Sequence, residues 1–355
     1  PVRYTWFDDN TPATMESGTE PAPVNLPSRT WLPGIFVQDE FSLSPSSTLL
    51  TGLRYDHHAV HGHIVTPRVN FRWKSDNGNN VVRVGLGSGY RVANIFTEDH
   101  AALTGARDVV FLENLMPETS WSLNLQWVHR YPLSEKWFFG WDISAFYTRF
   151  GNRIIADYDT DPDKIIYDNL DGFAISQGGV VNAELRNGEK FAVMVGCTAM
   201  DVFSVEYGMK QRQLFTENFA GVWSLSYRIA KCNLTIDYSG NVYSPMRLPL
   251  LGPLDPRRPE SPWWSIQNIQ LTKASGERLE IYGGVKNLLN WTPNRGNPFI
   301  IARAHDPFDQ GVQFDPSGQA LVTPDNPYGL TFDPTYVFGP NQGIRFFLGV
   351  RYRVG

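Results

Sequence analysis

Trp121-Ser-Leu-Asn-Leu-Gln-Trp127 alternates apolar and polar residues without a break. In an extended strand its Trp and Leu side chains fall on one face, and its Ser, Asn and Gln side chains fall on the other. A helix would instead bring apolar residues back at every third and fourth position. The stretch therefore predicts a β-strand with one apolar and one polar face.

The same period of two recurs along the chain, for example over residues 68–73, 82–87, 222–228 and 344–354. It predicts fourteen strands, near residues 2–7, 31–43, 48–57, 64–74, 80–88, 119–131, 136–150, 171–186, 189–202, 213–229, 232–245, 263–273, 277–289 and 343–354. Many of them have ten or more residues, against about 5–6 for an ordinary strand. A tilted strand needs about 9–11 residues to cross a bilayer, so the strand length indicates a membrane barrel.

The connections between these strands alternate in length. The short ones are residues 44–47, 75–79, 132–135, 187–188, 230–231 and 274–276. The long ones are residues 58–63, 89–118, 151–170, 245–262 and 290–342. Short turns at one end and long loops at the other are typical of an outer-membrane barrel whose short turns lie in the periplasm. Residues 197–212 are the one stretch where the alternation does not place a connection.

The composition agrees with this architecture. The chain holds 11 Trp, 15 Tyr and 22 Phe, and only 19% of its residues are charged. Membrane barrels carry such aromatic residues as girdles at both interfaces. The formal net charge of -5 argues against nucleic-acid binding, which usually needs a basic excess. Two cysteines without CxxC spacing predict neither a disulfide framework nor a zinc site.

The polar faces of the predicted strands carry many strongly polar side chains, most of them charged. They include Arg54, Asp56, Arg68, Asn70, Arg72, Arg83, Glu280, Lys286, Arg345, Arg351 and Arg353. An Arg or Lys that faces lipid at mid-depth costs ~2–4 kcal/mol, so these residues must face an enclosed polar interior. The predicted fold is therefore an all-β transmembrane antiparallel barrel. A soluble β-sandwich or propeller is the alternative, but it explains neither the strand length nor the charged faces.

Four of the seven histidines gather at one predicted loop tip: His57, His58, His61 and His63. Imidazoles this close in sequence are candidate ligands for zinc, copper or a haem iron. No cysteine or carboxylate spacing completes a known metal site, and an exposed polar loop is the alternative interpretation.

The chain lacks the sequence signatures of common enzymes, such as GxSxG, HExxH and Walker A. The glycine-rich Gly85-Leu-Gly-Ser-Gly-Tyr90 lies in a β-rich region, where glycine lets a strand pass close to a neighbour. We therefore expect no enzymatic activity and no bound cofactor. A membrane-embedded hydrolase is a further alternative, which no spacing of Asp, His and Ser supports.

The last long connection, residues 290–342, is dense in Pro, Gly, Asn and Asp. A loop of about 50 residues is far longer than the usual connection and tends to be functional. Its Arg295, Arg303, His305 and Tyr328 are candidate ligand contacts. A folded lid without ligand contacts is the alternative.

Three stretches resemble the barrel of TonB-dependent outer-membrane receptors, especially those of Bacteroidetes bacteria. The first is Gly52-Leu-Arg-Tyr-Asp-His-His58, which leads to Thr66-Pro-Arg-Val-Asn-Phe71. The second is Gly87-Ser-Gly-Tyr-Arg-Val-Ala-Asn-Ile-Phe-Thr-Glu98, followed by Leu115-Met-Pro-Glu-Thr-Ser120. The third is Gly283-Gly-Val-Lys-Asn-Leu-Leu-Asn290. Their order and spacing run across most of the chain.

The resemblance implies a 22-stranded barrel that is plugged by an N-terminal globular domain. Such receptors bind a scarce nutrient, such as a siderophore, haem, cobalamin or an oligomeric nutrient, and import it with energy delivered through TonB. We accordingly expect ligand contacts at Arg91, Asn94, Glu98 and His100. We also expect a location in the bacterial outer membrane with a periplasmic C-terminus. The expected partners are the TonB complex, the nutrient and membrane lipids, and a surface lipoprotein is an additional candidate partner. We expect no nucleic-acid partner.

The chain departs from the family pattern in length. The plug, the TonB box and about eight strands have no counterpart in it, and the predicted strands fit the last fourteen of twenty-two. We therefore interpret residues 1–355 as the C-terminal portion of the barrel, with a complete fourteen-stranded barrel as the alternative. For function, the alternative to active uptake is a passive porin or a structural receptor-like subunit of a larger assembly.

Overall fold

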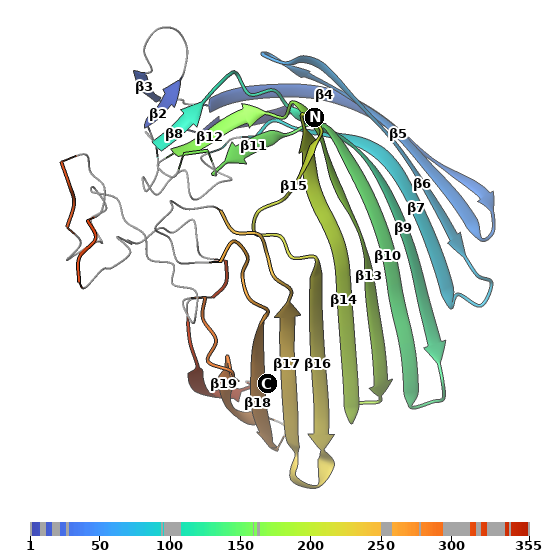
Figure 1. Cartoon of the computed structure of the whole chain (residues 1–355). Helices are drawn as coiled ribbons and strands as arrows, with labels where there is room; N and C mark the ends of the chain where they lie inside the picture. Colours follow the sequence, from blue (N-terminus) through green and yellow to red (C-terminus); the bar gives the residue numbers. More distant parts are fainter. Residues whose placement is uncertain are drawn as a thin grey trace.

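The computed structural model describes residues 2–7, 12–15, 22–25, 28–93, 95, 108–158, 160–161, 164–249, 258–276, 278–293, 313–316, 321–324, 338–340 and 342–353. These residues form one large, strongly curved sheet and one small sheet near its upper edge (Figure 1). Within the described part of the chain, none of the helical segments has the length and apolar character needed to cross a membrane.

The large sheet, called the wall below, is antiparallel throughout. In pairing order its strands are β1 (Val2–Phe7), β4 (Ser28–Ser44), β5 (Ser47–His58), β6 (Gly62–Lys74), β7 (Asn80–Arg91), β9 (Glu118–Pro132), β10 (Trp137–Asn152), β13 (Gly172–Asn187), β14 (Phe191–Glu206), β16 (Phe219–Ile229), β17 (Leu234–Tyr243), β18 (Trp264–Ser275), β19 (Leu279–Lys286) and β20 (Arg345–Tyr352). β15 (Met209–Arg212) pairs with β14 beside this path. These fourteen strands are the fourteen predicted from the alternation, so the all-β antiparallel fold is confirmed.

Connection length separates the two ends of the wall, as the sequence predicts. Three residues join β13 to β14, and the first of them, Gly188, adopts the left-handed φ of 51° that such a tight turn requires. A short 3-10 helix, η1 (Ala230–Cys232), joins β16 to β17 at the same end. The long connections all leave the opposite end, which is called the mouth below.

The outer face of the wall is apolar and solvent-exposed. Trp121 is 54% exposed, Leu125 is 45% exposed and Phe346 is 77% exposed, so these residues do not form a core. In a sheet, alternate residues face opposite sides, so Ser122, Asn124 and Gln126 point inward. They line an open inner cavity of about 800 Å³. The division into an apolar outer and a polar inner face therefore agrees with the prediction.

Polar side chains on the inner face bind one another across strands. Arg83 Nη1 donates to Gln126 Oε1 at 2.9 Å, and Gln126 Nε2 donates to Asp142 Oδ2 at 2.8 Å. At the far end of the wall, Arg351 and Arg353 both pair with Glu280. Several of the residues predicted to face inward thus bind partners on neighbouring strands, which satisfies part of their hydrogen-bonding groups.

The small sheet corrects the prediction that residues 89–118 and 151–170 are loops without strands of their own. Its order is β11 (Ile154–Asp157), β12 (Lys164–Asn169), β8 (Asp108–Phe111), β2 (Pro12–Met15) and β3 (Ala22–Asn25). β8 runs parallel to both β12 and β2. These strands have only four to six residues, and β8 pairs with segments far away in the sequence, so local alternation gives little signal for them.

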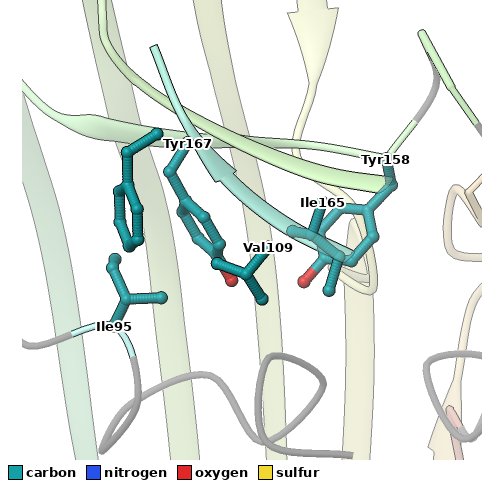
Figure 2. Close-up of a cluster of buried hydrophobic side chains, with 6 residues drawn as sticks. Ile95, Val109, Tyr158, Ile165 and Tyr167 are labelled. Carbon is teal, nitrogen blue, oxygen red and sulfur yellow. The ribbon is translucent and has the colours of Figure 1, made fainter. Parts of the chain in front are cut away.

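A buried apolar cluster holds the small sheet to the mouth. Ile165 is fully buried and Tyr167 is 2% exposed, and both belong to one cluster with Val109 and Ile95 (Figure 2). Leu214, which follows β15, packs against the same cluster. Val109 and Ile165 are Cα partners in the β8–β12 ladder, so alternate residues of each short strand supply this core.

Two of the differences between observed and predicted strand limits follow from the backbone conformation at a turn. Residues 197–212 complete β14 and turn at Tyr207 and Gly208 into β15, so β16 begins only at Phe219 instead of near residue 213. β19 ends at Lys286 because Asn287 adopts a left-handed φ of 53°, which no strand continues through.

Candidate ligand-binding pocket

A polar pocket of about 500 Å³ lies at the mouth, between the small sheet and the ends of the wall strands. It is lined by the last residues of β7 and β14, by β11, and by the segment that follows β15. Its charged lining residues are Arg91, Glu118, Arg153, Asp157, Glu206, Arg212 and Arg247. Four arginines against three carboxylates make it a candidate site for an anionic ligand.

Arg91 and Glu118 form the fixed part of this pocket. They are Cα partners across the β7–β9 ladder, and Arg91 Nη2 lies 2.7 Å from Glu118 Oε2. The Glu118 side chain is 8% exposed, and its Oε1 also accepts a hydrogen bond from the backbone N–H of Ile154 at 3.2 Å. Glu118 therefore joins β7, β9 and the first residue of β11. Of the predicted ligand contacts, Arg91 is the one that lines this pocket. Its guanidinium forms an ion pair with Glu118.

Arg153, between β10 and β11, is the less constrained cation. Its backbone carbonyl accepts a hydrogen bond from the N–H of Leu170 at 2.8 Å, but among the residues that the structure describes its side chain makes no ion pair and no hydrogen bond. Its guanidinium carbon lies 5.7 Å from the ring centroid of Phe150. Burial lowers the pKa of Arg153, while the nearby Glu118 carboxylate raises that pKa and the charge of Arg91 lowers it further. A partly buried guanidinium without a direct counter-charge favours binding of an anion.

Arg212 and Arg247 line the opposite side and serve mainly to hold the backbone. Arg212 Nη2 donates to the carbonyls of Thr216 at 3.0 Å and Pro245 at 2.8 Å. Arg247 Nη1 donates to the carbonyl of Arg212 at 3.0 Å. The Nε of Arg212 is buried and has no hydrogen-bond partner among the described residues. Sequence reasoning missed Arg153, Arg212 and Arg247, because each lies in a connection or a strand too short to predict.

Seven predicted contacts lie outside the described residues: Asn94, Glu98, His100, Arg295, Arg303, His305 and Tyr328. Their proposed contact with a ligand stays a prediction.

The β5–β6 hairpin divides the four clustered histidines into two pairs. His57 and His63 are Cα partners with ring centroids 5.1 Å apart, and Tyr55 Oη lies 2.6 Å from His63 Nδ1. His58 stacks on His61 with a centroid distance of 4.5 Å. Burial lowers the pKa of His61, and the nearby His58 lowers it further.

The geometry does not favour a metal centre at this hairpin. His57 and His58 are adjacent in β5, so their side chains leave opposite faces of the strand. Across the described ranges of the chain, no three His, Cys, Asp or Glu side chains are grouped so that they could hold a metal ion. The hairpin tip is better described as two separate aromatic pairs.

The chain was compared with protein families and known proteins. Residues 2–288 match the family model described as TonB dependent receptor-like, beta-barrel. No curated protein matches the chain. Among solved structures, a mutant of the ferric enterobactin receptor PfeA from Pseudomonas aeruginosa aligns with a TM-score of 0.63 and 17% identity, over 99% of this chain and 50% of that chain.

Two further structures are similar. The siderophore receptor PirA from Pseudomonas aeruginosa aligns with a TM-score of 0.54 and 19% identity, over 75% of this chain and 46% of that chain. The FrpB iron transporter from Neisseria meningitidis aligns with a TM-score of 0.55 and 13% identity, over 75% and 42% of the two chains. The chain thus spans about half the length of these proteins or less.

The wall and the matched family model together define an outer-membrane β-barrel protein. More specifically, the chain belongs to the TonB-dependent receptor-like β-barrel family, because the model covers most of its residues. This confirms the resemblance to the barrels of TonB-dependent receptors, while the narrower resemblance to those of Bacteroidetes stays a prediction. The likeness to the solved structures is a likeness of fold.

Proposed function

We propose that the chain is the C-terminal barrel portion of a Bacteroidetes-type TonB-dependent receptor that imports an anionic metal chelate of the siderophore class. In this proposal the mouth faces the cell exterior and the C-terminus lies in the periplasm. A plug domain would couple the barrel to TonB, and a surface lipoprotein could cover the mouth. Haem and cobalamin are less well matched, because the histidines at the hairpin tip do not form one group.

One observation carries the proposal: Arg153 stands in the mouth pocket without a direct counter-charge. A chelate built from catecholate or carboxylate groups presents oxygen anions that match a guanidinium. Arg91 and Glu118 hold the surrounding strands in place, so little reorganisation is needed when the ligand binds. Similar folds in proteins named as siderophore and iron receptors agree with this choice of ligand.

The experiment is a binding titration on the full-length protein in detergent, with tryptophan fluorescence as the readout. Ferric enterobactin is the anionic probe, and a neutral ferric hydroxamate is the comparison. Replacing Arg153→Gln should weaken binding of the anionic chelate by about tenfold or more, the worth of one charge-assisted hydrogen bond. Binding of the neutral chelate should change little.

Arg351→Gln is the matched control. Arg351 also lies on the inner face, but it pairs with Glu280 at the end of the wall away from the mouth. Its replacement should leave the affinity for the chelate unchanged. Equal affinity in the wild type and Arg153→Gln would remove the anionic-ligand assignment.

The inner cavity of about 800 Å³ favours a passive porin as the second candidate. The two functions differ in their energy source. Uptake by a TonB-dependent receptor should stop when TonB is deleted or the proton gradient is dissipated, whereas diffusion through a porin should continue. Uptake that persists in cells without TonB would therefore support the porin.

A further inference from the structure

Strands β6 and β7 of the wall separate before they reach the mouth. The pairing of these two strands ends at Arg68 and Gly87. Beyond that point β6 pairs only with β5, as far as Gly62, and β7 pairs only with β9, as far as Arg91. Residues 62–67 and 88–91 therefore border a fork in an otherwise continuous sheet.

A groove of about 340 Å³ occupies this fork. Its lining includes two large apolar side chains of the outer face, Val65 and Trp121, which are 55% and 54% exposed. Pro67 extends the apolar lining, Tyr90 adds an aromatic ring whose hydroxyl interacts with the Asp56 carboxylate, and Arg149 is the charged residue in the lining. The hydroxyl of Ser88, also in the lining, is buried without a hydrogen-bond partner among the described residues. The groove thus combines an apolar slot with one cation.

Arg149 is an unusual residue for this face. It is the Cα partner of Trp121, so it points outward, and it is exposed. Its guanidinium carbon lies 4.9 Å from the ring centroid of Phe173. Among the residues that the structure describes, it has no ion-pair partner. The register of β10 shifts at Gly151, and such bulges commonly re-aim side chains next to a functional site.

The position of Arg149 along the wall places it at a membrane interface. Tyr131 and Trp121 lie ten positions apart on β9, and both point outward. A strand tilted by ~40° advances about 2.5 Å per residue along the membrane normal, so ten residues cover about 25 Å. This is the usual height of the apolar band of a barrel. Trp121 and Arg149 therefore lie at the headgroup level on the mouth side.

We propose that the fork binds one lipid of the surrounding membrane leaflet. The lipid phosphate pairs with Arg149, and an acyl chain lies in the groove between Val65 and Trp121. Arginine is suited to phosphate because the N–H groups of its planar guanidinium match the spacing of the phosphate oxygens. An added peptide strand could pair with the open strand edges, but it would leave the cation without a counter-charge. The proposal depends on the membrane location of the family and is independent of which nutrient is imported.

The test is native mass spectrometry of the full-length protein in detergent, titrated with diphosphoryl lipid A. The same lipid without its phosphates and the soluble headgroup fragment glucosamine 1-phosphate are the comparisons. Arg149→Gln should weaken lipid A binding by about tenfold, and Arg149→Lys should weaken it less. Val65→Asn should also weaken binding, because it places a polar side chain in the acyl slot.

Lys273→Gln is the matched control, because Lys273 also points outward but lies at the opposite end of the wall. It should bind lipid A as the wild type does. Heat-dependent migration on a gel verifies that each variant folds. Equal binding by wild type and Arg149→Gln, or by the lipid with and without phosphates, would overturn the proposal. Tight binding of glucosamine 1-phosphate alone would also overturn it, since the groove would then be a phosphate site without a lipid chain.

Discussion

Arg54 binds the carboxylate of Asp56 with two nitrogens, two residues apart on the inner face of β5. Nε lies 2.6 Å from Oδ2, and Nη2 lies 2.7 Å from Oδ1. The Asp56 side chain is fully buried, whereas that of Arg54 is 34% exposed. Gly34 of β4 is the Cα partner of Asp56. A side chain at Gly34 would overlap Asp56 Oδ1, so this glycine provides the space for the ion pair.

Gly34→Ala should therefore destabilise the wall near the mouth. The added Cβ forces either Asp56 or the β4 backbone to move, which typically costs ~1–3 kcal/mol. The measurement is the free energy of unfolding in urea for the protein refolded into lipid vesicles. Gly179→Ala is the matched control, since its Cβ would lie at an ordinary 3.6 Å from the Ser144 carbonyl oxygen. Equal destabilisation by the two variants would contradict the steric explanation.

Asn287 joins the two ends of the last long connection. Its Nδ2 donates to the carbonyls of Trp291 at 2.7 Å and Gln342 at 3.0 Å, and its Oδ1 accepts from the N–H of Trp291 at 3.0 Å. Asn287→Ala should lose these bonds and also strain a backbone with φ of 53°, for a cost of ~2–4 kcal/mol.

Asn287→Gly separates the two contributions, because glycine accepts the left-handed backbone but has no side chain. Amide exchange at Trp291 should speed up in both variants, and the alanine variant should be less stable than the glycine variant. If the Asn287→Ala and Asn287→Gly variants are equally stable, backbone strain does not contribute to the loss of stability.

His58 closes the tip of the β5–β6 hairpin. Its Nδ1 accepts from the backbone N–H groups of Val60 and His61, each at 3.2 Å, and the residue is 4% exposed. His58→Ala should weaken the turn by ~1–2 kcal/mol and speed up amide exchange at Val60 and His61. His57→Ala is the control, because the exposed His57 ring makes no such bonds to the turn. Unchanged exchange in His58→Ala would show that the turn is held by its backbone alone.

The wall could be predicted from sequence because each strand has one lipid-facing and one polar face, as in Trp121–Trp127. That constraint acts on every residue of a long strand, so the alternation is strong. β8, β11 and β12 carry no such constraint. Their runs are short, and Val109-Val110-Phe111 of β8 becomes a strand because segments distant in sequence pair with it.

The site was less predictable for the same reason. Arg91 could be found because it ends a long predicted strand within a family motif. No sequence motif marks Arg153. It belongs to the candidate site because of its burial and its distance from other charges, which only the structure gives. The histidine cluster was visible in sequence, but sequence proximity hid the fact that His57 and His58 face opposite sides.

Asp168 should make the stability of the small sheet depend on pH. Burial raises the pKa of this carboxyl, the Glu113 side chain adds to the shift, and Asp171 raises the pKa further, while a hydrogen bond from the Asn169 N–H opposes it. The folded state therefore binds more protons than the unfolded state, in which the pKa is about 3.9. The stabilisation is complete below that value and is lost as pH rises through the folded-state pKa, so the sheet should be more stable in mild acid than at neutral pH.

Amide exchange at the fully buried Ile165, corrected for the intrinsic effect of pH, measures this stability. The protection of Ile165 should fall between acidic and neutral pH in the wild type, and Asp168→Asn should reduce this slope because the amide cannot ionise. Asp161→Asn is the control, since Asp161 lies before β12 in a partly exposed ion pair with Lys164. A wild-type protection that instead rises with pH would mean that another group, with a lowered pKa, controls the small sheet.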